Sequence, residues 1–243
     1  MEKPEAFDER ASENPFWKVG PKAYRDQGDK LLPQERGLIS DFVYYLRGWE
    51  VPTLYCIWTA LFMISSVVKR DMWLKWGDSG FFANLYVLLI GLAGVVKKST
   101  AIFKGIPSLK AFPNHIQSPR LRELKKIRLI KDKSTPEAVI QTMASRGTRQ
   151  VKLADGTLTK IPDTSETAIV VSELATLANK KQYNESLVDL LTDLYDNHDE
   201  WSDKSKTAGK FKLRAVYTTM LAATTPTGFR SSIPKQAGED GFL

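Results

Sequence analysis

Residues 85 to 90 read LYVLLI, six apolar residues in succession, and Gly91 follows them directly. An apolar run of this kind with a glycine behind it is typical of a central parallel strand, because helices cover both faces of such a strand. Other candidate strands alternate with segments of helical periodicity and lie at 125–131, 168–171 and 215–223. This alternation predicts an α/β fold with a central, mainly parallel sheet.

A helical segment is expected ahead of this core. In residues 35–47 the apolar side chains recur at helical spacing, which predicts one buried face made of Leu38, Phe42, Tyr45 and Leu46. Residues 51–68 carry no formal charge and are just long enough to cross a bilayer, but they include Thr, Ser and a Pro at the second position. We interpret them as a buried core helix. The expected organisation is an arm at 1–33, a helical preface at 34–80 and a core at 81–243.

Local signals predict shorter elements within and around the core. Alternation predicts strands, hydroxyl side chains before proline predict helix starts, and Asp-Gly pairs predict hairpin turns. In chain order these signals give a short strand with Met72, Leu74 and Trp76 before a turn at 77–80, a helix from Pro136 capped by Ser134 or Thr135, a hairpin around Asp155-Gly156, and a helix at 186–195.

The composition excludes several classes of protein. A chain of 243 residues with 42% hydrophobic residues can bury one main core, and it is too short for several modules. The lone Cys56 excludes an internal disulfide, no Cys/His cluster exists for zinc, and the N-terminus has no signal-peptide pattern, so a reducing cytosol is expected. Thirty-five basic against 28 acidic residues leave a net charge of +7, which suits a polyanionic partner.

The segment GLAGVVKKSTAI, residues 91–102, carries the strongest chemical signal. A phosphate-binding loop needs small residues for converging amides, a lysine for the outer phosphates, a hydroxyl for Mg²⁺ and a helix start beneath it. Lys98 and Ser99 occupy the last two roles of the motif, with Thr100 behind them, but Lys97 stands where the standard motif has glycine and Gly91 lies one residue too far away. The alternative is an ordinary turn, GLAG, followed by a solvated pair of lysines.

Two further strand ends support the phosphate-loop interpretation. AIVVSEL places Ser172 and Glu173 after an apolar strand, and an acid at such a place can orient the attacking water while its neighbour usually gives an Asp to the metal. Here that neighbour is Ser172, which leaves magnesium to water or to the serine hydroxyl. Thr225 follows the candidate strand at 215–223, where it can sense a γ-phosphate or simply cap the next helix before Pro226.

Other candidate residues point less clearly to chemistry. His115 and His198 stand 83 positions apart without metal-ligand spacing, and the acidic cluster Asp189, Asp193, Asp196, Asp199 and Glu200 fits the solvated end of a helix better than a cation site. The best polyanion footprint is a basic run interleaved with apolar residues, which can instead be a strand flank. Its members are Lys110, Arg120, Arg122, Lys125, Lys126, Arg128, Lys131 and Lys133.

Several of these segments together resemble a known family. The segments FVYYLRGWEVPTLYCIWTALFMISSVVKRDMWL, NLYVLLIGLAGVVKKSTAI, AIVVSELATL, DLLTDLYDNHDEW, MLAATTPTGF and GEDGFL are similar, in this order, to the phage and prophage P-loop ATPases of replication proteins, which are helicase- or primase-like. The resemblance implies a P-loop core related to ring helicases and AAA+ proteins. It assigns Glu173 to the catalytic acid and Thr225 to the sensor, and it assigns the nucleotide loop to Gly91, Gly94, Lys97, Lys98, Ser99 and Thr100.

The resemblance also implies ATP and Mg²⁺ as ligands, single-stranded DNA as partner, a ring-shaped assembly and the cytoplasm of a bacterial host. Ser99 and Ser172 are the expected metal contacts. The family pattern continues into a Ser-Arg pair that would supply an arginine finger, whereas this chain stops at Leu243 with only Arg230 nearby, so we expect a truncated chain or slow hydrolysis. A nucleotide-dependent loader or scaffold with little hydrolysis is the alternative, and membrane attachment through residues 51–68 is a weaker third.

Overall fold

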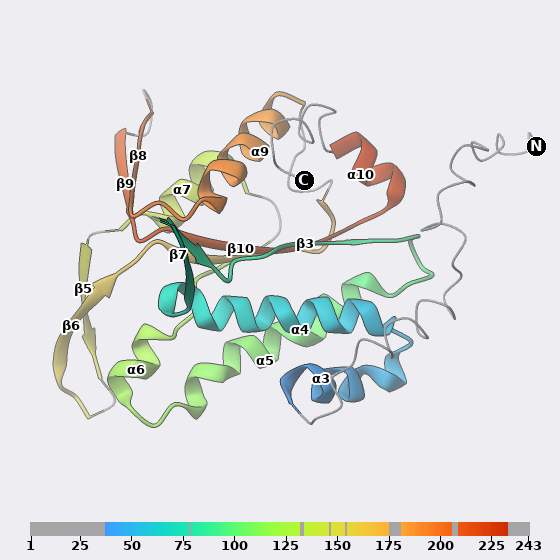
Figure 1. Cartoon of the computed structure of the whole chain (residues 1–243), viewed down its shortest axis with the longest axis horizontal. Coiled ribbons are helices and arrows are strands. Elements are labelled where there is room, and N and C mark those ends of the chain that lie inside the picture. Colours follow the sequence, from blue (N-terminus) through green and yellow to red (C-terminus); the bar gives the residue numbers. More distant parts are fainter. Residues whose placement is uncertain are drawn as a thin grey trace, which may run out of the picture.

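A parallel sheet forms the centre of the molecule. The computed structural model describes residues 37–77, 79–131, 134–145, 147–153, 155–174, 181–205 and 209–232. Four parallel strands lie side by side in the order β3 (Tyr86–Ile90), β10 (Tyr217–Thr224), β7 (Glu166–Val171) and β4 (Leu129–Lys131). The chain is therefore an α/β protein with a four-stranded parallel sheet, preceded by helices (Figure 1).

The position of β3 corrects one expectation. The LYVLLI strand was expected at the centre, but among the described strands it lies at an edge, and every residue of β10 is buried instead. An apolar run indicates that both faces of a strand are covered, but it does not indicate whether the strand has one neighbouring strand or two. Val87 packs against the helices on one face, and on the other the Tyr86 hydroxyl donates to the carbonyl oxygen of Leu191 at 2.8 Å.

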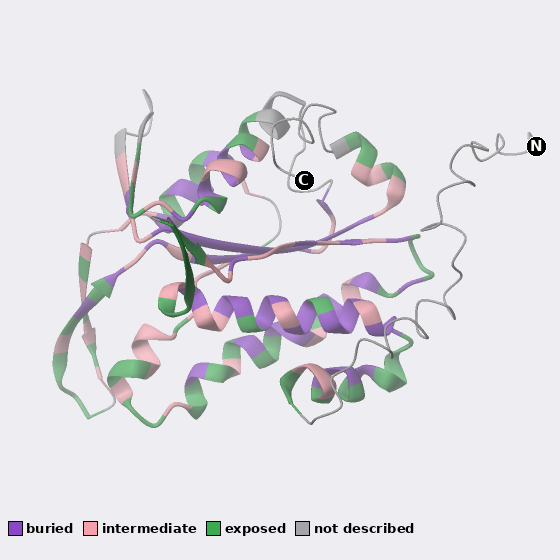
Figure 2. Ribbon diagram, viewed as in Figure 1, coloured by how far each residue is buried: buried purple, intermediate pink, exposed green. Residues whose placement is uncertain are grey.

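Helices cover both faces of the sheet, as Figures 1 and 2 show. Alternate strand residues point to opposite faces, so Val170 and Leu221 join one apolar cluster while Ile169 and Met220 join the other. The first cluster includes α3 (Leu38–Leu46), α4 (Thr53–Val68) and α5 (Lys98–Ala111). The second includes α7 (Pro136–Met143) and α9 (Lys181–Tyr195).

The two N-terminal helices confirm the expected helical segment, with one difference in the buried face. In α3 the buried residues are Phe42, Val43 and Leu46, whereas Leu38 and Tyr45 are exposed, so the prediction for these two was wrong. The reason is that α3 packs mainly against one neighbour, α4, on the side away from the sheet. One neighbouring helix buries a narrower stripe of α3 than several neighbours would.

Helix α4 is the buried core helix that the sequence predicts. The Ser65 hydroxyl of this helix finds partners on the sheet, since its Oγ donates to Thr219 Oγ1 at 2.9 Å and lies 2.9 Å from the Tyr217 hydroxyl oxygen. These bonds satisfy polar groups that would be costly to bury alone. Within the described part of the chain, no helix has the length and apolar character that crossing a bilayer requires.

Three antiparallel hairpins of the described chain project from the end of the sheet at which its strands begin, which we call the amino edge. Two or three residues connect each hairpin to the parallel strand that follows it, and all four parallel strands begin at this amino edge. The pairs are β1 (Trp73–Trp76) with β2 (Ser79–Phe82), β5 (Gly147–Lys152) with β6 (Leu158–Asp163), and β8 (Glu200–Ser205) with β9 (Gly209–Arg214). The Asp155-Gly156 pair predicted the second hairpin, and Gly156 has the left-handed backbone (φ 85°) of such a turn.

Short elements complete the described structure. They are η1 (Arg47–Trp49), η2 (Lys69–Asp71), η3 (Phe112–His115), α6 (Pro119–Leu124) and α10 (Pro226–Ser232). Of the two candidate caps for α7, Thr135 is the one that accepts from the Ala138 amide, at 3.3 Å. The expected arm at 1–33 and Lys133 of the basic run lie outside the described residues.

Candidate functional site

The segment with the strongest chemical signal forms a strand, a loop and a helix. Strand β3 ends at Ile90, the loop covers residues 91–97, and α5 begins at Lys98. The middle of the loop, residues 92–95, is exposed. Because the loop follows the carboxyl end of a parallel strand, it lies at the edge where α/β proteins bind ligands. The first amides of α5 have no partners within the helix and give this end a partial positive charge.

The two loop glycines are needed for different reasons. A Cβ at Gly91 would overlap the Val96 side chain and lie 2.6 Å from the hydroxyl oxygen of Tyr55. That hydroxyl, from α4, donates to the carbonyl oxygen of Ile90 at 2.6 Å and so fixes the end of β3. Gly94 has open space around it but a left-handed backbone, with φ of 76°. Packing thus requires glycine at 91, and backbone conformation favours it at 94.

Lys98 points back into the loop that precedes it. Its ammonium nitrogen donates to the carbonyl oxygen of Gly91 at 2.6 Å and to that of Leu92 at 3.3 Å, and only 7% of the residue is exposed. Burial lowers the pKa of the Lys98 ammonium, while the negative charge of Glu173 acts to raise it. The arrangement holds one buried cation directly beneath the exposed part of the loop. Lys97, by contrast, is exposed and has left-handed backbone.

Glu173 reaches the same place from another strand. It lies two residues beyond β7, and its Oε1 accepts a hydrogen bond from Thr224 Oγ1 at 3.4 Å. Thr224 ends β10, the strand between β3 and β7, and its carbonyl oxygen accepts from the Gly91 amide at 3.1 Å. Three strand ends therefore bring Lys98, Glu173 and Thr224 to one site.

Thr225 has a different role from Thr224. Its hydroxyl accepts from the Gly228 amide at 3.0 Å and contacts Thr227 Oγ1 at 3.1 Å, so it caps the start of α10. The structure thus contains the capping contact that the sequence left open for Thr225, and the sensor role stays a prediction. Thr224, which contacts Glu173, is the site residue that sequence reasoning did not select, although the Thr-Thr pair was its visible signal.

The remaining candidates for the nucleotide loop and metal are close to these residues in the chain. Ser99 and Thr100 are the second and third residues of α5 and are half-buried, and Ser172 directly follows β7 and is also half-buried. A serine hydroxyl at the start of a helix below such a loop is a suitable ligand for Mg²⁺. Among the described residues, no group of three or more His, Cys, Asp or Glu side chains could hold a metal on its own.

His198 and several of the acidic residues outside this site have structural partners. His198 Nε2 lies 3.0 Å from Asp193 Oδ1, and the other oxygen of Asp193 accepts from the Trp201 indole. Asp199 pairs with Arg70. These contacts follow the end of α9, in agreement with the interpretation of the acidic cluster as a helix end. His115 is exposed at the end of η3.

Much of the basic run is engaged within the molecule. Arg122 donates to the Ile116 carbonyl, and Lys125 donates to the Val67 carbonyl and pairs with Asp71. Arg128 contacts the Met143 carbonyl and Asp163, and Lys126 pairs with Glu123. Lys110 and Arg120 are exposed. The run is thus mainly a structural network with a few exposed cations.

The fold and this site define the chain as an α/β protein with two characteristic residues. Lys98 is buried in the unit of β3, loop and α5, and Glu173 follows β7, the second strand from β3 in the sheet. A scan against protein-family models found no match for the chain. A search of curated proteins found no match either.

Proposed function

We propose that this protein is a P-loop ATPase of phage DNA replication that binds ATP at the loop of residues 91–97 and hydrolyses it. The observation that carries the proposal is the position of Lys98 and Glu173, which follow β3 and β7 at the same end of the sheet and interact electrostatically. A cation for phosphate oxygens and a carboxylate for water are the two charged groups that phosphoryl transfer to water needs. Only the sequence resemblance supports a phage origin and a role in replication.

The residues present fit a nucleotide with magnesium. Small residues, a left-handed Gly94 and the start of α5 supply backbone amides for phosphate oxygens, and Lys98 supplies a charge that is already in place. Ser99 would hold Mg²⁺, with Ser172 or water completing its ligands. The bound ion would neutralise charge on the phosphates.

The protein's own groups would then divide the work. Lys98 would leave one of its carbonyl partners and bind the β- and γ-phosphate oxygens. Glu173 would accept a hydrogen bond from the attacking water and draw its proton away, with Thr224 Oγ1 keeping the carboxylate in position through its bond to Oε1.

The second candidate is a nucleotide-dependent loader or scaffold with little hydrolysis. Ser172 favours it, because it stands beside Glu173 where an Asp more usually binds the metal, and a neutral hydroxyl is a weaker ligand. Binding without turnover would then regulate the contact with DNA or with a ring of further copies.

Phosphate release measured with and without single-stranded DNA separates the two candidates. The ATPase proposal expects DNA-stimulated release in the wild type and a loss of about 10²- to 10⁴-fold in Glu173→Gln, which keeps the side-chain shape but cannot accept the proton. Glu137→Gln, the same exchange at an exposed glutamate on α7, is the matched control and should behave as the wild type. Nucleotide binding without measurable release in the wild type would favour the loader, and no binding would refute both.

A further inference from the structure

The β1–β2 hairpin exposes a set of large apolar side chains. Between 58% and 71% of each of these residues is exposed, and the set comprises Met72, Trp73, Leu74, Trp76 and Phe81. Single exposed apolar residues are ordinary, but several on one short hairpin indicate a surface that binds something. From the sequence this segment was interpreted only as a short strand and a turn.

One face of this aromatic hairpin combines rings with positive charge. Residues opposite each other in an antiparallel pair share a face, so Trp73 lies with Phe82, and Lys75 lies with Gly80. The Trp73 ring lies over Gly80, where a Cβ would be 3.4 Å from its Cε3. The Arg70 guanidinium lies 4.4 Å from the centroid of the Phe82 ring. Aromatic rings flanked by cations are the chemistry that binds bases and phosphates together.

The other face carries Leu74 opposite Phe81, with Trp76 beside the turn. Rings on both faces of a two-stranded ribbon suit a flexible strand whose bases can stack on either side. A rigid protein partner would cover one face and leave the other rings in water. This geometry favours an unpaired nucleic acid over a flat protein surface.

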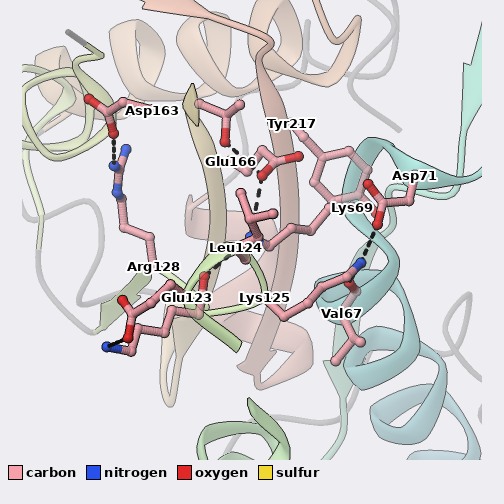
Figure 3. Close-up of polar contacts among 12 residues, drawn as sticks. Val67, Lys69, Asp71, Glu123, Leu124, Lys125, Arg128, Asp163, Glu166 and Tyr217 are labelled. Atoms are coloured by element: carbon pink, nitrogen blue, oxygen red, sulfur yellow. Dashed lines mark hydrogen bonds and ion pairs between the residues drawn. The ribbon is translucent and has the colours of Figure 1, made fainter. Parts of the chain in front are cut away.

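A cavity of about 490 Å³ lies beside η2, the segment that precedes the first strand of the hairpin. Its walls come from η2, which leads directly into β1, and from α6, β6 and the start of β7. Three carboxylates, of Asp71, Asp163 and Glu166, line it, and they are outnumbered by five cations, those of Lys69, Lys125, Lys126, Arg128 and Arg149. Figure 3 shows that the labelled groups form separate ion pairs, namely Lys69 with Glu166, Lys125 with Asp71 and Arg128 with Asp163.

The charges of the cavity differ in how far they can reach a ligand. Lys69 is 7% exposed and is held by Glu166 Oε2 at 3.3 Å and by the Leu124 carbonyl at 3.0 Å, so it supports the wall. Burial lowers the pKa of the Lys69 ammonium, while Glu166 acts to raise it. The Lys126 side chain is 57% exposed, and its ammonium nitrogen lies 2.6 Å from Glu123 Oε1. Even with Glu123 counted as the partner of Lys126, one more cation than carboxylate remains at this wall, and the exposed Lys126 can approach a polyanion.

We propose that single-stranded nucleic acid binds at this amino edge of the sheet, with unpaired bases stacked on Trp73 and Trp76 and with phosphates against Lys75 and Lys126. Duplex DNA hides the faces of its bases, so the rings select single strands. The site lies at the opposite edge of the sheet from the loop of Lys98, because hairpins precede the strands that the loop and Glu173 follow. This inference names the place of the DNA contact in the proposed function, and it does not require hydrolysis.

Fluorescence anisotropy of a labelled oligothymidylate, measured without nucleotide on the full chain, tests the proposal. We expect Trp76→Ala to weaken binding by about tenfold or more, and Trp76→Phe, which keeps a ring, to restore most of it. Tyr44→Ala on α3 is the matched control, since Tyr44 is as exposed as Trp76, at 71%. Lys126→Ala should weaken binding less and lower its salt dependence.

Competition experiments identify the ligand class. The unlabelled single strand should displace the probe, whereas the same sequence as a duplex, inorganic polyphosphate or anionic vesicles should do so poorly. The proposal is overturned if Trp76→Ala binds as the wild type does, if a duplex competes equally well, or if the variant instead abolishes self-association in sedimentation. The oligonucleotide is measured without ATP, so the two proposals are tested separately. Weak oligonucleotide binding would not contradict ATP binding at Lys98, and a failure to bind ATP would not contradict oligonucleotide binding at the hairpin.

Discussion

The ammonium nitrogen of Lys98 lies 2.6 Å from the carbonyl oxygen of Gly91, so the lysine closes the loop on the residue at which that loop begins. This contact holds the cation ready and also stabilises the loop. A ligand phosphate can replace the second, longer bond to Leu92 at 3.3 Å with little rearrangement. In the proposed function, this contact would hold the lysine in place before a nucleotide arrives, which would lower the ordering cost of binding.

Lys98→Ala should reduce ATP affinity by about ten- to hundredfold, because a hydrogen bond to a charged group contributes about 1.5–3 kcal/mol. Isothermal titration with a non-hydrolysable ATP analogue and Mg²⁺ measures this. Lys98→Arg should restore little, since the longer planar guanidinium cannot occupy the buried position of the ammonium group. Unchanged affinity in Lys98→Ala would contradict the role of the loop.

The neighbouring threonines should respond differently to substitution. Thr224→Val removes the hydroxyl that holds Glu173, so we expect turnover to fall several-fold while ATP affinity changes little. Thr225→Ala removes the cap of α10 and should cost about 1 kcal/mol of stability, with turnover nearly unchanged. Phosphate release and thermal unfolding of both variants, measured side by side, check this. A fall in turnover in Thr225→Ala, with unchanged turnover in Thr224→Val, would support the sensor role of Thr225 instead.

The two loop glycines give a second matched pair. Gly91→Ala places a methyl group against Val96 and the Tyr55 hydroxyl, and overpacking of this kind costs about 1–3 kcal/mol and displaces the end of β3. Gly94→Ala meets open space and costs about 1–2 kcal/mol for the left-handed backbone alone. We expect both to lower the melting temperature.

Nucleotide affinity distinguishes the members of this glycine pair. Gly91→Ala moves the carbonyl that orients Lys98 and should weaken binding more than Gly94→Ala does. Tyr55→Phe, which removes the hydroxyl but keeps the ring, should partly relieve the Gly91→Ala clash in the double variant. Equal affinities for the two single variants would mean that the carbonyl of residue 91 does not position the lysine.

The elements that depend on local signals were predictable from the sequence. The strand at LYVLLI, the loop after it and the cap of α7 each follow from a few adjacent residues, and all three are present. The order of the strands depends on distant pairing, so β3 was placed at the centre although β10 is the strand with neighbours on both sides. The β8–β9 hairpin was missed because its polar residues lack a turn pair such as Asp-Gly.

The candidate site was predictable in part for the same reason. Lys98 and Glu173 follow apolar strands, and parallel strands end at one edge, so their proximity was a reasonable expectation. The choice between Thr224 and Thr225 depends on where β10 ends, and strand ends are poorly marked in sequence. The aromatic hairpin was visible as residues but not as a surface, since exposure is a property of the whole fold.

The stability of the protein should fall as the pH rises above 9, because of a thiol in the core. Cys56 is 1% exposed, and burial raises the pKa of its thiol from 9.0 to about 12. Above pH 9 the unfolded chain releases this proton while the folded protein retains it, so stability present below pH 9 is lost as the pH rises toward 12.

The loss amounts to about 1.4 kcal/mol per pH unit, and urea unfolding at pH 8, 9 and 10 measures it. The Tyr217 hydroxyl, whose pKa burial raises from 10.0 to about 12, adds a similar slope above pH 10. Below pH 10, therefore, Cys56→Ala should remove this fall in stability and leave the opposite contribution of Lys69 and Lys98, whose lowered pKa values make stability rise with pH, although the smaller side chain lowers stability at every pH. A fall that survives in Cys56→Ala between pH 9 and 10 would show that another group is responsible, and a native thiol that reacts rapidly with a disulfide reagent would show that Cys56 is not buried.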